Sequence, residues 1–74
     1  MPDLPVASGR DARRAFERLG WVFHRQTGSH MILTKVGSVA SLSIPDHREL
    51  APGTLRKLIR AAGITVEEFR AALA

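Results

Sequence analysis

The chain has no cysteine and no long apolar run. Without cysteine it has no disulfides and no thiolate metal sites, a composition that fits a reducing compartment. No stretch approaches the roughly 20 apolar residues that a membrane-spanning helix needs. The start, Met1-Pro2-Asp3-Leu4-Pro5, lacks the basic and apolar regions of a secretory signal. We therefore expect a soluble protein of the cytoplasm that does not act at a membrane.

The chain is also short. It has 74 residues, and a domain of this size buries only about 60% of the surface that its unfolded chain exposes. That leaves no room for a second domain or a deep cofactor cavity, so we expect no cofactor. Repeats, linkers and low-complexity tracts are missing as well. We expect a single domain over residues 1–74, with residues 1–7 as a flexible N-terminal segment.

Acidic residues are scarce relative to basic ones. Seven Asp and Glu stand against eleven Lys and Arg, which gives a net charge of +4 and an isoelectric point near 11.2. Most of the basic residues are arginines, whose planar guanidinium matches the geometry of a phosphate. Such an excess favours an anionic partner, either a nucleic acid or an acidic protein.

Two long segments have the features of helices. Ser8 is a suitable N-cap for the first, with Asp11 in its acidic first turn, and Gly20 is suited to end it. The second starts near Pro52-Gly53-Thr54 and ends at Gly63. Apolar residues recur at helical spacing in both: Ala12, Ala15, Phe16 and Leu19 in the first, and Leu55, Leu58, Ile59 and Ala62 in the second.

A short third helix is predicted over residues 66–73. Thr65 is its N-cap, and Glu68 completes a capping box. Ile64, just before the cap, is expected to pack on Phe69 as a hydrophobic staple.

Three strands are expected between the first two helices, at residues 21–25, 30–35 and 39–44. In the third strand, serines alternate with apolar residues, which predicts one wet face and one dry face. Pro45 is expected to end this strand, because a residue without an N–H cannot continue the ladder.

These elements define the fold class. Three antiparallel strands can bury only one face against two helices, which gives an α+β two-layer sandwich. The order is α-β-β-β-α with a three-stranded antiparallel sheet, plus a short C-terminal helix. This is the layout of a double-stranded-RNA-binding domain.

A histidine stands just past the tight turn between the first two strands. Gly28 can adopt a positive φ without steric cost and so closes the turn. His30 then falls at the start of the outgoing strand, on the rim of the sheet. Histidine can both accept and donate a proton near neutral pH. A basic protein that displays this group beside a turn is a candidate for acid–base chemistry on an anionic polymer.

Five sequence blocks together resemble the HicA toxin family. They follow one another at family spacing from about residue 8, across nearly the whole chain. The blocks are Gly20-Trp21, Arg25-Gln26-Thr27-Gly28-Ser29-His30, Ile44-Pro45-Asp46-His47, Glu49-Leu50-Ala51-Pro52-Gly53-Thr54-Leu55-Arg56 and Ala62-Gly63-Ile64-Thr65.

The resemblance implies a bacterial or archaeal messenger-RNA interferase of a type II toxin–antitoxin pair, with a double-stranded-RNA-binding-like fold. It also implies inhibition by a cognate HicB antitoxin. The family's catalytic histidine corresponds to His30, in a Gly-Ser-His motif that this chain keeps.

Cleavage of RNA needs little machinery, because RNA carries its own nucleophile, the 2′-OH. A positioned base for this hydroxyl, or an acid for the leaving 5′ oxygen, contributes about 10²- to 10⁴-fold. His30 can supply the base. His47, which follows the third strand, is a possible second catalytic group; a structural role in the connection after Pro45 is the alternative for it. The sequence leaves open which face of the sheet His30 occupies.

Several residues are predicted to contact RNA. Arg25 is the first choice for a phosphate contact, because it lies nearest His30 in the sequence. Arg56 and Lys57 come next, because folds of this kind approach the nucleic-acid backbone with helix ends and loops. The full predicted set is Arg25, Gly28, Ser29, Lys35, Arg56, Lys57 and Arg60.

Other prominent residues have simpler explanations. His24 is expected to be a solvated strand residue, and three widely spaced histidines without cysteine do not resemble a zinc site. Pro52-Gly53-Thr54 fits either a phosphate site at a helix N-terminus or a helix cap. Arginines every four residues along a helix usually form a solvated face, and the aromatic residues are expected in the core: Arg10, Arg14 and Arg18, and Phe16, Trp21, Phe23 and Phe69.

A second class of function also fits the sequence. The chain could be a non-catalytic RNA- or DNA-binding module on the same fold, or an inert toxin remnant that only binds its antitoxin. The Gly-Ser-His motif favours the ribonuclease, because a pure binding module has no use for a titratable group at the rim.

Overall fold

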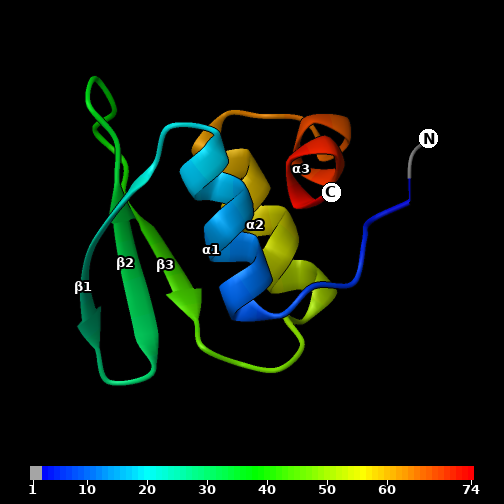
Figure 1. Cartoon of the computed structure of the whole chain (residues 1–74), viewed down its shortest axis with the longest axis horizontal. Helices are drawn as coiled ribbons and strands as arrows, with labels where there is room; N and C mark the ends of the chain where they lie inside the picture. Colours follow the sequence, from blue (N-terminus) through cyan, green and yellow to red (C-terminus); the bar gives the residue numbers. More distant parts are fainter. Residues whose placement is uncertain (1–2) are drawn as a thin grey trace.

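The fold is an α+β arrangement with the element order α-β-β-β-α-α (Figure 1). The computed structural model describes residues 3–74. This order confirms the predicted helix, three antiparallel strands, helix and short C-terminal helix, while the likeness to a double-stranded-RNA-binding domain stays a prediction. The elements are α1 (Gly9–Arg18), β1 (Val22–Thr27), β2 (His30–Thr34), β3 (Leu42–Pro45), α2 (Pro52–Ala62) and α3 (Val66–Leu73).

The three strands form one antiparallel sheet with β2 in the centre. Helices α1 and α2 pack against one face of this sheet, and α3 packs against α1 on the side away from the strands (Figure 1). Within residues 3–74, no helix covers the second face of the sheet. We call this second face the open face. In the same range, the helices are too short or too polar for any of them to cross a membrane.

The core fills the space between the sheet and the helices. Phe16 of α1 meets Phe69 of α3 with 5.2 Å between ring centroids and 47° between ring planes, a tilted arrangement that aromatic pairs favour. Ile64, before α3, packs against the core cluster that contains Phe69, and its direct contact with Phe69 stays a prediction. The largest fully buried side chains are Phe16, Phe69, Met31, Leu33, Leu42, Ile44 and Leu55.

Two of the three helix starts are capped as the sequence predicts. The Ser8 hydroxyl accepts a hydrogen bond from the backbone N–H of Asp11 (3.0 Å). At α3, the Thr65 hydroxyl accepts from the backbone N–H of Glu68 (3.1 Å), and the Glu68 carboxylate accepts from the backbone N–H of Thr65 (2.9 Å). These bonds satisfy amides that a helix start otherwise leaves unpaired.

The start of α2 differs from the expected cap. Its N-cap is Ala51, which offers no side-chain hydrogen bond, so Thr54 does not cap the helix. Pro52 occupies the first turn, where a missing N–H costs nothing. Gly63 ends the helix in the left-handed conformation, with φ of 72°.

The predicted third strand starts too early. Residues 36–41 form a loop, in which the backbone N–H of Ser38 donates to the carbonyl of Lys35 (3.0 Å) and the N–H of Ala40 donates to the Ser38 hydroxyl (3.2 Å). These local bonds hold the chain away from the ladder until Leu42. The alternating burial predicted for this strand holds within Leu42–Pro45.

Pro45 belongs to β3, whereas the sequence predicted that it ends the strand. It pairs with His30, and the next ladder bond runs from the N–H of Asp46 to the carbonyl of Ser29 (2.7 Å). Pro45 therefore occupies a position whose N–H would face away from β2. Because β3 is an edge strand, the missing donor disturbs nothing.

The other two strands differ from the predicted ones at their ends. Trp21 precedes β1 and is buried in the core instead of starting the strand. β1 then continues to Thr27, two residues beyond the predicted end, because it pairs with β2 right up to the turn. β2 ends at Thr34, one residue earlier than predicted.

The N-terminal segment was predicted to be flexible over residues 1–7, of which residues 1–2 lie outside the described residues. The described part has no helix or strand. Ala7 is buried, and its carbonyl accepts a hydrogen bond from the N–H of Leu50 (2.8 Å). Leu4 packs against the core cluster. Flexibility of this segment stays a prediction.

Asp11 is expected to make stability depend on acid. A hydrogen bond with the Ser8 side chain, and the Arg14 guanidinium, hold the pKa of Asp11 below its ordinary value. A lowered folded-state pKa stabilises the fold above the unfolded pKa of about 3.9, and this contribution is lost as pH falls through the folded-state pKa. Urea unfolding at a series of pH values should therefore show a larger loss on acidification for the wild type than for Asp11→Asn. An equal loss of stability in the two proteins on acidification would contradict the pairing of Asp11 with Ser8 and Arg14.

Candidate functional site

The turn between β1 and β2 has an open tip. Gly28 has φ of 59°, as the turn requires, and apart from its two chain neighbours no residue has an atom within 4 Å of the position a Cβ would take. The Gln26 amide donates to the carbonyl of Gly28 (3.1 Å) and braces the turn from one side. Thr27 and His30 are paired directly across it. The tip is thus fixed at its base and exposed at Gly28 and Ser29.

His30 is on the open face of the sheet. Side chains alternate along a strand, and its neighbours Met31 and Leu33 are buried against the helices. His30 is exposed, and within residues 3–74 no hydrogen bond engages its imidazole. Both ring nitrogens are therefore available to a ligand. This placement answers the question that the sequence left open.

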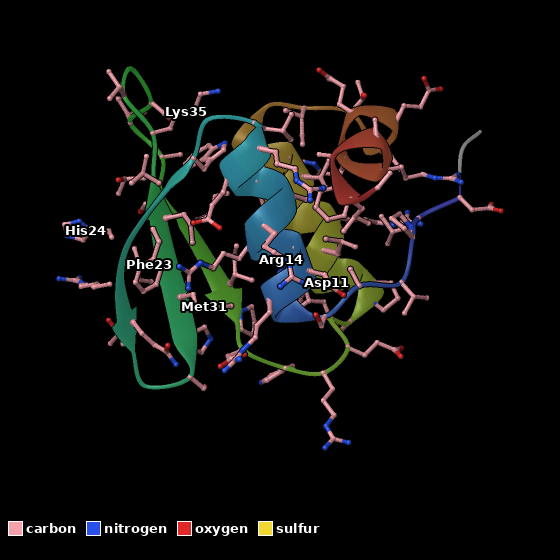
Figure 2. All side chains as sticks on the ribbon, in the orientation of Figure 1. Asp11, Arg14, Phe23, His24, Met31 and Lys35 are labelled. Carbon is pink, nitrogen blue, oxygen red and sulfur yellow. The ribbon has the colours of Figure 1, made fainter. Side chains whose placement is uncertain are left out.

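A β-bulge brings Arg25 to the same face. Arg25 pairs with Ile32, and the register shifts at His24, which has no partner of its own on β2. Without this extra residue, simple alternation from the core-facing Phe23 would turn position 25 toward the helices. With it, Arg25 shares the open face with Ile32 and lies two residues along the ladder from the Thr27–His30 pair. Figure 2 shows His24 pointing away from the helices.

Arg25 is a free cation in the described part of the chain. It is exposed, and no hydrogen bond or ion pair within residues 3–74 holds its guanidinium. An open face with a free imidazole and a free guanidinium can grip a phosphate and act on its neighbouring hydroxyl.

The segment after β3 lies beside the same end of the sheet. The bond from Asp46 N–H to Ser29 O holds this segment against the β1–β2 turn. The backbone carbonyl of His47 accepts a hydrogen bond from the N–H of Gly9 (2.8 Å), so its main chain is structural while its side chain is exposed. Arg48 follows, exposed and without a hydrogen bond or ion pair inside residues 3–74. Sequence reasoning missed Arg48, although it directly follows the Ile44-Pro45-Asp46-His47 block.

The arginines of α1 are occupied, in contrast to Arg25. Arg10 pairs with Asp46 (3.2 Å), and Arg14 pairs with Asp11 on the outer side of α1 (Figure 2). Arg18 donates to the carbonyls at the end of α3, at 2.6 and 2.7 Å. Arg10 and Arg18 therefore tie α1 to other parts of the fold, while Arg14 is paired within the helix.

A groove of about 230 Å³ separates α1 from the β1–β2 hairpin. Inside it, the Arg13 guanidinium lies 3.8 Å from the centroid of the Phe23 ring and 3.6 Å from the Glu17 carboxylate. Each of the three arginines that line the groove is paired with a carboxylate, so none of them is free to bind an anion as Arg25 is. Its lining is Arg10, Arg13, Arg14, Glu17, Gln26, Met31 and Asp46.

The remaining predicted RNA contacts lie elsewhere. Lys35 is at the opposite end of β2 from the turn (Figure 2), where its ammonium donates to the carbonyl of Leu19 (3.2 Å). The other three are on α2, which packs on the face of the sheet opposite the open face: Arg56, Lys57 and Arg60. The structure thus brings three of the seven predicted RNA contacts, Arg25, Gly28 and Ser29, to the same end of the sheet as His30.

Metal and stacking sites find no support in the described residues. Within residues 3–74, no three histidine or acidic side chains come together to hold a metal ion. Trp21, Phe16 and Phe69 are buried, and Phe23 is partly buried beneath Arg13, so these rings are core residues, as predicted.

Comparison with protein-family models finds a match over most of the chain. The HicA_toxin model, described as "HicA toxin of bacterial toxin-antitoxin", matches residues 9–64 of the 74-residue chain. A comparison with curated proteins found no match. The matched range includes the turn, His30, the bulge and the connection after β3. The chain therefore belongs to the HicA toxin family, the toxins of bacterial toxin–antitoxin systems.

Proposed function

We propose that this toxin is an endoribonuclease that cleaves messenger RNA in the cytoplasm, with His30 as its general base. The observation that carries the proposal is the exposed His30 imidazole on the open face, with the free Arg25 on the same face two residues along the ladder. Membership of a toxin family supplies the biological setting. A binding module alone would not need an unengaged imidazole at this position.

The proposed reaction uses the nucleophile that RNA already carries. His30 takes the proton of a 2′-OH, whose oxygen attacks the adjacent phosphorus. The bond from phosphorus to the 5′ oxygen breaks, which leaves a 2′,3′-cyclic phosphate on one fragment and a 5′-OH on the other. The leaving oxygen gains a proton, and His47, beside the same end of the sheet, is the second candidate group for this step.

Arg25 would hold the phosphate on which the reaction takes place. Its guanidinium can bind two phosphate oxygens at once and stabilise charge that builds up on them during attack. The exposed backbone at Gly28, which has no side chain, would allow an RNA strand to approach closely, with Ser29 exposed beside it. The remaining predicted contacts would reach only those parts of a longer RNA that lie away from the cleaved phosphate; they are Lys35, Arg56, Lys57 and Arg60.

The partner that toxin family membership implies is an antitoxin, and we propose a HicB-type protein that covers His30 and Arg25 together. The net charge of +4 favours an acidic surface on this partner. Association driven by charge should weaken as salt is raised, mainly through a slower on-rate.

Cleavage is expected to need no divalent metal, because the proposed chemistry uses only side chains and the 2′-OH. The purified protein should cut single-stranded or looped RNA in EDTA, yield cyclic phosphate ends and leave DNA intact. Gel analysis of end-labelled RNA, with end-group digestion of the products, measures all three. Loss of activity in EDTA, or equal cleavage of DNA, would exclude this mechanism.

A further inference from the structure

A second hollow lies on the far side of the helical layer from His30. It has a volume of about 630 Å³ and is bounded by α2, the start of α3 and the N-terminal segment. No strand contributes to it, so a molecule bound there would leave the open face of the sheet free. The lining residues are Leu4, Arg56, Ile59, Arg60, Ile64, Thr65, Val66 and Glu67.

The floor of this hollow is apolar. Leu4, Ile64 and Val66 are only partly buried, although all three pack against the core cluster. Ile59 lies beneath them and is almost fully buried. Apolar surface that is gathered in a concavity and left partly exposed is typical of a binding site.

Two free guanidiniums stand over this floor. Arg56 and Arg60 are one helical turn apart on α2, so they extend from the same side of the helix. Both are exposed, and within residues 3–74 neither makes a hydrogen bond or an ion pair, with Glu67 or any other residue. The arginines of α1 differ in this respect, since each of them has a partner.

This combination fits a peptide better than a nucleic acid. Interfaces with nucleic acid are strongly polar and basic, whereas half of this lining is apolar. A peptide helix with an apolar stripe can fill a hydrophobic groove, while its carboxylates pair with arginines at the edge.

We propose that the hollow docks an acidic, amphipathic segment of the antitoxin, with apolar side chains on the floor and carboxylates on Arg56 and Arg60. This inference rests on the proposal that the antitoxin is an acidic protein. The hollow would give the antitoxin a second contact surface on the toxin, separate from the open face that carries His30.

The test uses the full chain, observed by two-dimensional ¹H–¹⁵N NMR. The first probe is a short synthetic peptide with leucines at helical spacing and glutamates between them. A second peptide has serines in place of the leucines, and the third probe is a short oligouridine. The leucine peptide should shift the amide signals of Ile59, Ile64 and Val66, while the serine peptide and oligouridine should leave them unchanged.

Neighbouring residues of α2 supply a matched pair of variants. Arg56→Glu and Lys57→Glu change the net charge equally, but only Arg56 lines the hollow. Arg56→Glu should weaken binding of the leucine peptide at least about tenfold, because it places like charges in contact. Lys57→Glu should weaken it by no more than about twofold, through the general field alone.

Three outcomes would overturn the proposal. Equal effects of the two variants would show that only a general charge attraction acts. Equal binding of the serine peptide would show that the apolar floor takes no part in binding. Shifts caused by oligouridine alone would make the hollow a nucleic-acid surface. His30→Ala should keep its peptide affinity, so failure of peptide binding and failure of RNA cleavage are separate results.

Discussion

Replacement of His30 by alanine should abolish growth arrest and lower the RNA cleavage rate by at least about 10²-fold, the low end for losing a general base. The imidazole is exposed and unengaged within residues 3–74, so its removal leaves no buried partner unsatisfied. Stability should change by no more than about ±0.5 kcal/mol, as is usual for such surface sites. Growth assays and single-turnover cleavage at matched soluble expression measure both effects.

Two other histidines serve as controls for this substitution. His24→Ala removes the same side chain from the neighbouring strand, where it points away from the helices (Figure 2), and should leave the rate unchanged. His47→Ala should lose some rate or stability but keep toxicity. A folded His30→Ala protein that remains fully toxic would refute the catalytic assignment and favour the non-catalytic binding module.

Replacement of Gly9 by alanine should cause the largest loss of stability among single-methyl changes in this fold. A Cβ at this position would lie 1.9 Å from the carbonyl oxygen of Pro45 and 3.2 Å from the Cα of Asp46. Both contacts are to backbone, so either α1 or the segment after β3 must move. Overpacking of this kind costs about 1–3 kcal/mol and sometimes more, and the midpoint of urea unfolding should fall accordingly.

Gly53→Ala is the matched control for that change. Gly53 is also in the first turn of a helix, but nothing lies within 4 Å of its Cβ position. Alanine there should be neutral or should stabilise by about 0.4–1 kcal/mol, because it restricts the unfolded chain. If Gly9→Ala and Gly53→Ala behaved alike, the close approach of α1 to Pro45 would be wrong.

The helices could be predicted well because their signals are local. Ser8 caps α1 through an amide three residues away, and Thr65 and Glu68 form their box within one turn. The start of β3 could not be predicted in the same way. Residues 39–41 belong to an alternating pattern that suits a strand, but hydrogen bonds of Ser38 hold them in a loop.

The candidate site was predicted in part for a similar reason. The turn and His30 follow from neighbouring residues, whereas the position of Arg25 depends on a bulge against β2 at His24. Nothing in the sequence alone marks where one strand gains an extra residue relative to its partner.

The role of the α1 arginines depends on contacts that are distant in sequence. Arg10 forms an ion pair with Asp46, 36 residues away in the sequence. Arg18 donates hydrogen bonds to carbonyls at the end of α3, more than 50 residues away. Helical spacing alone predicts a solvated stripe, and only the tertiary fold shows these side chains to be bound. The same fold leaves Arg25 and Arg56 free within residues 3–74.

The central claim, that His30 takes the proton of the 2′-OH, can be tested with one modified substrate. An RNA in which sulfur replaces the leaving 5′ oxygen needs no acid at that atom, because a thiol with a pKa near 8.5 leaves readily as its anion. If His30 is the base, His30→Ala should still cut this RNA at least about 10²-fold more slowly than the wild type. Recovery of the wild-type rate on the sulfur substrate would show that His30 acts as the acid and would contradict its assignment as the base.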